Sequence, residues 1–210
     1  MNTSQALRIV VVATDLMPEG EDLLAQQELI ERSNTLRIGL LESGFNLVAT
    51  LPPDVFLTER IGQLQPDLII VDAESDARDA LEHVVFATRE ERRPIVMFTD
   101  DADTSFVGDA FSKGVCAYVV SGMEHHRIRP ILEVALARFK HEENLRKELS
   151  LAKEALESKS VLDRAKALIM QKHHLSEPEA YAKMRKIAMN RGLKITQLAQ
   201  NIVDIEELLL

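Results

Sequence analysis

The chain of 210 residues has a single cysteine, Cys116, so it cannot hold an internal disulfide framework. This scarcity is typical of proteins that work in a reducing compartment. No apolar run approaches the roughly 18–20 residues that a membrane-spanning helix needs. The apolar stretch before Asp15 is too short for a secretory signal and is typical of a strand. We therefore expect a cytoplasmic protein that does not enter the membrane.

The sequence also lacks the motifs on which the common classes of enzyme depend. It has no Gly-rich phosphate loop and no nucleophile elbow. Two adjacent histidine pairs, His125-His126 and His173-His174, have no Cys or third His at ligand spacing, and neighbouring side chains on a helix diverge. We expect no catalytic activity, no cofactor and no bound metal, and we expect Cys116 to be a small buried residue.

The net charge of −9 is unevenly distributed along the chain. Residues 1–157 hold 16 Lys and Arg against 28 Asp and Glu, whereas residues 158–210 hold nine against six. All nine cations of the second stretch lie between Lys159 and Lys194. A basic segment on an acidic body indicates nucleic-acid binding. A solvated helical face accounts for so small a surplus equally well.

Strand-length apolar runs alternate with helix-length segments in the first two thirds of the chain. Such continuous apolar runs, separated by helices, predict an α/β fold with a doubly wound five-stranded parallel sheet. Two of the predicted helices are Leu23–Ser43, which Gly44 would end, and Asp76–Thr88. The five predicted strands are Arg8–Val12, Leu47–Thr50, Leu68–Val71, Ile95–Phe98 and Ala117–Val120.

The pattern changes at Ile128, after which no Gly and only Pro130 occur before His173. The residues Leu145, Leu149, Ala152 and Leu156 step by 4, 3 and 4, which predicts one long helix with a short coiled-coil seam. Such a seam would support a homodimer. A solvated linker helix is the alternative, because Glu142 occupies the preceding core position.

The end of the chain predicts an all-α segment. Ser176-Glu177-Pro178-Glu179 is a capping box that begins a helix, and Gly192 is its expected stop. Ile195-Thr196 opens the last helix, which places Leu198 and Ile202 on one face. We therefore expect a first domain over residues 1–138, a helical coiled-coil linker over 139–157 and a three-helix domain over 158–210.

Polar side chains follow three of the predicted strands, at the sheet edge where ligands of doubly wound folds bind. Asp72 ends the third strand, Thr99 the fourth and Ser121 the fifth. With this arrangement, residues 7–138 resemble the receiver domain of two-component systems. The resemblance implies a pocket formed by Asp15, Thr99 and Ser121 around Asp72, the possible phosphoacceptor.

The sequence departs from the receiver pattern at the charged residues that phosphorylation needs. Only Asp15 remains of the acidic pair that would hold magnesium, and Ser121-Gly122 stands where a receiver carries Lys. We therefore interpret Asp72 as a strand-end residue whose carboxylate caps nearby backbone rather than as a phosphoacceptor. The segment from Asp15 to Leu36 is longer than the first loop and helix of a receiver require. It is either a partner-binding insertion or a longer first helix.

The stretch Val161–Val203 resembles the ANTAR domain, the three-helix RNA-binding module of bacterial transcription antiterminators. The matching elements are Arg164-Ala165-Lys166, Leu168–Met170, Leu175-Ser176, Glu179-Ala180-Tyr181, Met184-Arg185, Ala188-Met189 and Leu198-Ala199. The resemblance implies that Lys and Arg hold RNA phosphates and that side chains read unstacked loop bases. The candidate RNA-binding residues are Arg164, Lys166, Arg185, Lys186, Arg191 and Lys194. We expect Tyr181 and the three methionines of this stretch to lie in the core.

Two further stretches, Val71–Asp103 and Ala117–Phe139, resemble the NasT-type regulators of nitrate assimilation. This implies a function: RNA polymerase would read through a leader terminator ahead of nitrate and nitrite reductase genes when the chain binds leader stem-loops. It also implies a partner, a nitrate-sensing protein of the NasS type. The alternative is a phosphorylation-dependent two-component response regulator that binds DNA. A last helix without Lys or Arg, Thr196–Leu210, argues against a DNA-reading role.

Overall fold

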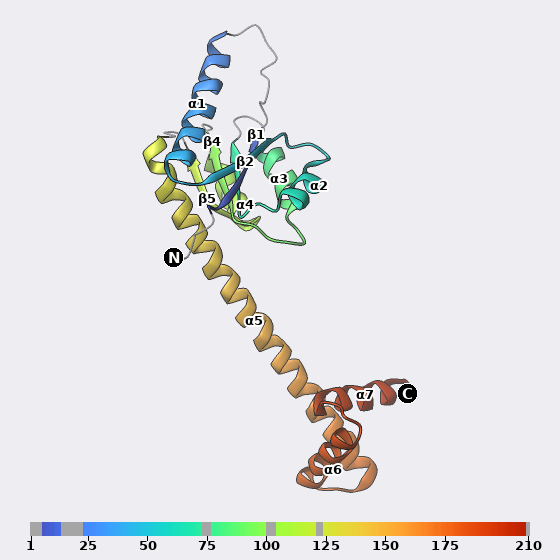
Figure 1. Cartoon of the computed structure of the whole chain (residues 1–210). Coiled ribbons are helices and arrows are strands. Elements are labelled where there is room, and N and C mark those ends of the chain that lie inside the picture. Colours follow the sequence, from blue (N-terminus) through green and yellow to red (C-terminus); the bar gives the residue numbers. More distant parts are fainter. Residues whose placement is uncertain (1–5, 14–22, 73–76, 100–103, 121–123, 209–210) are drawn as a thin grey trace, which may run out of the picture. The chain divides into compact units, whose positions relative to one another are not determined.

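The chain divides into two compact units, Met1–Glu142 and Glu143–Leu210, which are described one after the other. The computed structural model describes residues 6–13, 23–72, 77–99, 104–120 and 124–208 (Figure 1). Two of the predicted pocket residues, Asp15 and Ser121, lie outside these ranges.

The first unit is built on five parallel strands in the order β2-β1-β3-β4-β5. This is a doubly wound order. The central strand β1 lies between β2 and β3, so the chain first runs outward to β2 and then crosses back over β1 to β3. Each predicted apolar run forms one of these strands, so the predicted fold class is confirmed. The strands are β1 Arg8–Ala13, β2 Asn46–Leu51, β3 Leu68–Asp72, β4 Ile95–Thr99 and β5 Val115–Val120.

Helices cover both faces of the sheet and bury its alternating side chains. Val10 and Val12 of β1 face the core that includes α2, α3 and α4, whereas Ile9 and Val11 face the core of α1 and α5 (Figure 1). This two-sided burial explains why the strands are continuous apolar runs. The helices of this unit are α1 Leu23–Glu42, α2 Leu57–Leu64, α3 Ala77–Ala87, the short 3₁₀ turn η1 Thr104–Phe106, α4 Val107–Ser112 and the first part of α5 His125–His173.

The helix α1 crosses the start of α5 at Gly39. A Cβ at this position would collide with the Cδ1 atom of Ile128 and would lie 2.8 Å from the carbonyl oxygen of His125. Only glycine therefore permits this approach of the two helices. Within its described residues, the long segment before Leu36 is helical from Leu23 onward as part of α1.

The second unit consists of the rest of α5, α6 Glu177–Asn190 and α7 Ile195–Leu208. The predicted long helix is confirmed, because α5 is continuous over 49 residues with Pro130 near its start. Small and apolar side chains of the three helices share one core: Ala165, Ile169, Ala180, Met184, Ala188, Leu198, Ala199 and Val203. Among the described residues, no helix has the length and apolar content needed to cross a membrane.

Both turns of this helical unit are closed by left-handed residues. At the end of α6, Gly192 has a φ of 64°, and the Leu193 N–H donates to the Ala188 carbonyl at 3.0 Å. At the end of α5, His174 has a φ of 53°, and the Leu175 N–H donates to the Met170 carbonyl at 3.2 Å. These are Schellman-type closures that satisfy terminal carbonyls. The predicted stop at Gly192 is confirmed, while the non-glycine closure at His174 was not predicted.

Candidate nucleic-acid interface

The helix α6 begins at the predicted capping residue. The Glu179 carboxylate accepts hydrogen bonds from the backbone N–H of Ser176 at 2.9 Å and from its Oγ at 2.6 Å. These bonds lower the pKa of Glu179 below its ordinary value. Pro178 lies in the first turn, where its missing N–H costs nothing. The capped end fixes where α6 starts.

Three small or flexible residues of α6, Ala180, Met184 and Ala188, are buried against the other helices. They are spaced by four residues and therefore form one narrow stripe along the helix. Burial of this stripe leaves the opposite side of α6 in solvent.

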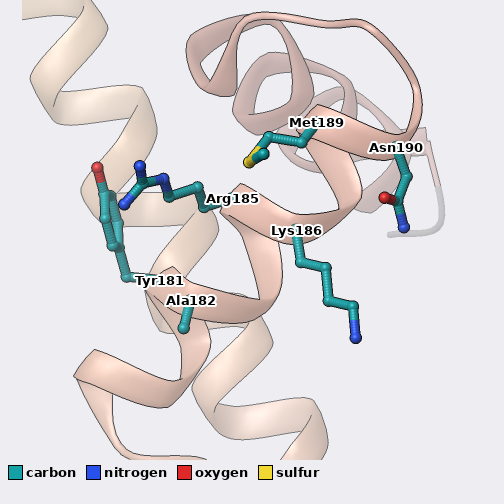
Figure 2. A pocket seen from close by; sticks show the side chains of 6 residues that line it. All are labelled: Tyr181, Ala182, Arg185, Lys186, Met189 and Asn190. Atoms are coloured by element: carbon teal, nitrogen blue, oxygen red, sulfur yellow. The ribbon is translucent and has the colours of Figure 1, made fainter.

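The solvent side of α6 carries two parallel stripes that surround a shallow hollow of about 290 Å³ (Figure 2). One stripe consists of Tyr181, Arg185 and Met189, and the Arg185 side chain extends toward Tyr181 in Figure 2. The second stripe consists of the next residue in each turn, Ala182, Lys186 and Asn190. No carboxylate lines the hollow, so its two cations give it a positive charge.

Two expectations about this helix were wrong. Tyr181 is 41% exposed and Met189 is 72% exposed, so neither belongs to the core. An aromatic residue next to Ala180 was expected on the buried side, but the buried stripe is too narrow to include it. Met184 is fully buried as expected.

The six candidate cations fall into two groups. Arg164 and Lys166 of α5 are engaged in ion pairs: Arg164 Nη1 lies 2.7 Å from Glu207 Oε1 of α7, and Lys166 Nζ lies 2.7 Å from Glu177 Oε1 of α6. Four cations are exposed, and no described carboxylate pairs with them: Arg185, Lys186, Arg191 and Lys194. The structure therefore brings Arg185 and Lys186 together at the hollow and leaves Arg164 and Lys166 tied within the bundle.

The second candidate site is the sheet edge at Asp72. The Asp72 Oδ1 atom accepts from Arg32 of α1, with 2.8 Å to Nε and 2.7 Å to Nη2. Thr99 at the neighbouring strand end is 1% exposed. The expectation that Asp72 caps backbone did not include this arginine, which lies 40 residues away in the sequence.

The remaining candidates for chemistry are the cysteine and the histidine pairs. Cys116 is buried, and burial raises the pKa of its thiol. His125 and His126 are exposed and lie near Glu42 and Glu124, at 3.3 Å each. Among the described residues, no three His, Cys, Asp or Glu side chains gather as metal ligands would.

Comparison with known sequences covers both units. Residues 151–203 match the family profile of the ANTAR domain, a stretch that holds the end of α5, all of α6 and most of α7. The transcriptional regulatory protein PdtaR of Mycobacterium tuberculosis is 27% identical to this chain over 182 residues. The matched region spans 87% of this chain and 88% of PdtaR.

Comparison with solved structures concerns the fold of the first unit. The signal receiver domain of a modulated diguanylate cyclase from Desulfovibrio desulfuricans G20 matches with a TM-score of 0.51 at 18% identity, over 66% of this chain and 99% of that one. A LuxR-family two-component response regulator from Aurantimonas sp. SI85-9A1 matches with a TM-score of 0.50 at 19% identity, over 63% and 86%. The chain thus joins a fold of the receiver type to a C-terminal ANTAR domain.

Proposed function

We propose that this chain is a transcription antiterminator that binds hairpin RNA through residues 158–210. The ANTAR match over residues 151–203 and the similarity to a transcriptional regulatory protein support this function. The observation that carries the proposal is the solvent face of α6, where Arg185 and Lys186 line one hollow with an exposed Tyr181 and without any lining carboxylate.

This face has the chemistry that RNA hairpins require. Phosphates are held by Lys and Arg, while the bases of a small loop are unstacked and can lie on an aromatic ring or a guanidinium plane. We assign loop-base contact to Tyr181 and Arg185, because they share one stripe, and phosphate contact to Lys186 on the next stripe. Arg191 and Lys194, exposed just beyond α6, would extend the phosphate track.

The genes and the partner follow from the resemblance of Val71–Asp103 and Ala117–Phe139 to NasT-type regulators. We propose that the target is a leader ahead of nitrate and nitrite assimilation genes, and that RNA polymerase is affected only through this RNA. A nitrate-sensing protein of the NasS type would hold the chain inactive until nitrate binds to the sensor.

The competing function, a phosphorylation-dependent DNA-binding regulator, has less support. Its reading helix would be the last one, but the described α7, Ile195–Leu208, has no Lys or Arg. Its switch would be Asp72, whose carboxylate already pairs with Arg32 at 2.7 Å. Both features favour the RNA-binding function.

The test is a selection from a pool of RNA hairpins with randomised loops, followed by filter binding of the selected hairpin at several salt concentrations. Arg185→Ala should lower affinity by about 1–3 kcal/mol with little change in salt dependence, by analogy with base-edge contacts. Lys186→Ala should reduce the log–log salt slope by about 0.7–0.9. Lys183→Ala is the matched control, since Lys183 is on α6 but does not line the hollow.

Two results would contradict the proposal. One is equal affinity of the unsubstituted chain for duplex DNA and for the selected hairpin. The other is an equal loss of RNA affinity in Lys183→Ala and Lys186→Ala, because a nonspecific charge effect would then explain binding.

A further inference from the structure

Lys166 is held between two carboxylates that belong to different helices. Its Nζ atom lies 2.7 Å from Asp163 Oδ1, one turn earlier on α5, and 2.7 Å from Glu177 Oε1, the first residue of α6. The Lys166 side chain is only 16% exposed, whereas both carboxylate side chains are more than half exposed. Lys166 therefore links the last turns of α5 to the start of α6, and its side chain is the least exposed of the three.

The link lies at the start of α6, beside the core that this helix shares with α5. In that core Ala165 and Ala180 are fully buried and lie with the larger side chains of Ile169 and Met184. These contacts hold α6 along its middle, whereas the ion pair acts at its first residue. An ion pair at the first residue of α6 supplies a lateral restraint on that helix, and Glu177 is also favoured there by the helix dipole.

The same geometry distinguishes Lys166 from the cations around the hollow. An ammonium has three donors, and carboxylates already occupy two of those of Lys166. An RNA phosphate would have to displace these carboxylates from Lys166. Displacement of Glu177 would remove the ion pair that ties the start of α6 to α5. Arg185 and Lys186 have no described carboxylate partner and carry no such cost.

We propose that Lys166 is a positioning residue: its link to Glu177 sets the orientation in which α6 presents Tyr181, Arg185 and Lys186 to RNA. This rests on the proposed RNA-binding function. Lys166 itself makes no contact with RNA, so its contribution to affinity passes entirely through Glu177 and the orientation of α6.

The experiment is a charge exchange in the full chain, measured with the selected RNA hairpin over a series of salt concentrations. Lys166→Glu and Glu177→Lys should each weaken binding about tenfold, an order of magnitude typical of contacting pairs. The double exchange places a lysine at position 177 between Asp163 and a carboxylate at 166, and it should restore affinity to within about threefold. Lys166→Arg should also retain binding, and its salt slope should equal that of the unsubstituted chain.

A phosphate contact by Lys166 predicts a different pattern. Glu177→Lys would then strengthen binding by adding a cation, the double exchange would stay as weak as Lys166→Glu, and Lys166→Met would lower the salt slope by about 0.7–0.9. Any of these results would overturn the positioning role. Amide NMR spectra of α6 supply a readout without RNA: resonances displaced in each single variant should return in the double exchange.

The positioning role and the proposed function fail in different ways. If Arg185→Ala abolishes binding while every Lys166 variant binds fully, the positioning role is overturned and the RNA-binding function stands. If the unsubstituted chain selects no hairpin, the function is overturned and the positioning role with it. If Lys166→Glu does not fold, Lys166→Met and Lys166→Arg carry the same comparison.

Discussion

Arg32 and Asp72 form a two-point ion pair in which Nε and Nη2 of the arginine both meet Oδ1 of the aspartate, at 2.8 and 2.7 Å. Each side chain is 10% exposed. The aspartate at the end of β3 is thus neutralised from within the chain, by a cation that α1 supplies. A guanidinium is permanently charged and directional, so this pair is a fixed part of the first unit.

Asp72→Ala should therefore act on stability. Removing the carboxylate takes away the two-point pair with Arg32, whose side chain is 10% exposed, at a cost of about 2–3 kcal/mol after allowance for that exposure. Exchange of both residues for leucine should recover part of this loss, because neither side chain then carries a charge. Urea denaturation of the three proteins measures the difference. Asp72→Asn retains an acceptor and should keep regulated expression. If a fully folded Asp72→Asn protein loses regulated expression, that result would instead indicate phosphorylation of Asp72.

The exposed leucines of α5 should mediate a homodimer. Leu145, Leu149 and Leu156 are 51%, 56% and 68% exposed and follow coiled-coil spacing. Replacing Leu149 and Leu156 with lysine should weaken association and, because two domains can engage two hairpins together, weaken RNA binding as well. Leu151→Lys is the control, since Leu151 is equally exposed but off the seam. Sedimentation equilibrium that gives one monomer mass for all proteins, with and without RNA, would contradict the seam.

The left-handed closure at His174 predicts an unusual order of substitutions. A non-glycine residue at a φ of 53° costs about 1 kcal/mol, which His174→Gly should partly recover. His174→Val should lower stability by about 1 kcal/mol or more, because a branched Cβ tolerates this conformation poorly. His173→Gly, one residue earlier in α5, should be destabilising, since that position is helical. Equal stability of His174→Gly and His174→Val would show that the closure is not strained.

Glu179 should make the stability of the second unit depend on pH in the acid range. Its pKa is lowered in the folded state, because the Ser176 hydroxyl and N–H donate to the carboxylate. A lowered carboxylate pKa stabilises the fold above the unfolded value, and this stabilisation is lost as pH falls through the folded pKa. Glu179→Gln should therefore lower Tm near neutral pH and reduce the fall of Tm between about pH 5 and 3.

The proposed sensor imposes a reciprocal relationship. If nitrate releases this chain from a NasS-type protein, nitrate and the chain must weaken each other's binding to the sensor by the same factor. Calorimetric titration of the sensor with nitrate, alone and in the presence of the chain, measures that factor. The same nitrate affinity in both titrations would refute regulation by release.

The elements of the fold follow closely from the sequence, because each is specified by local residues. The apolar run Leu68–Val71 has no alternative to burial on both faces, and the glycines at 44 and 192 end their helices where expected. The side of α6 that is buried depends instead on partners elsewhere. Ala180, Met184 and Ala188 are buried in a core formed with residues of α5 and α7, and this orientation turns Tyr181 and Met189 outward.

The ion pairs were less predictable for a related reason. Lys166 and Glu177 are 11 residues apart, Arg32 and Asp72 are 40, and Arg164 and Glu207 are 43. Charge counting identified Arg164 and Lys166 as cations but could not reveal that each already has a carboxylate partner. Whether a lysine is available to RNA depends on the turn at His174, which brings Glu177 back to α5.

The outward position of Tyr181 has an optical consequence. The chain contains no tryptophan and only two tyrosines, and the other, Tyr118, is partly buried in β5 of the first unit. With Tyr118→Phe, all intrinsic fluorescence above the phenylalanine range would come from the ring at the hollow of α6. An unlabelled chain can thus report on the approach of a nucleobase, because stacking on that ring would quench its emission.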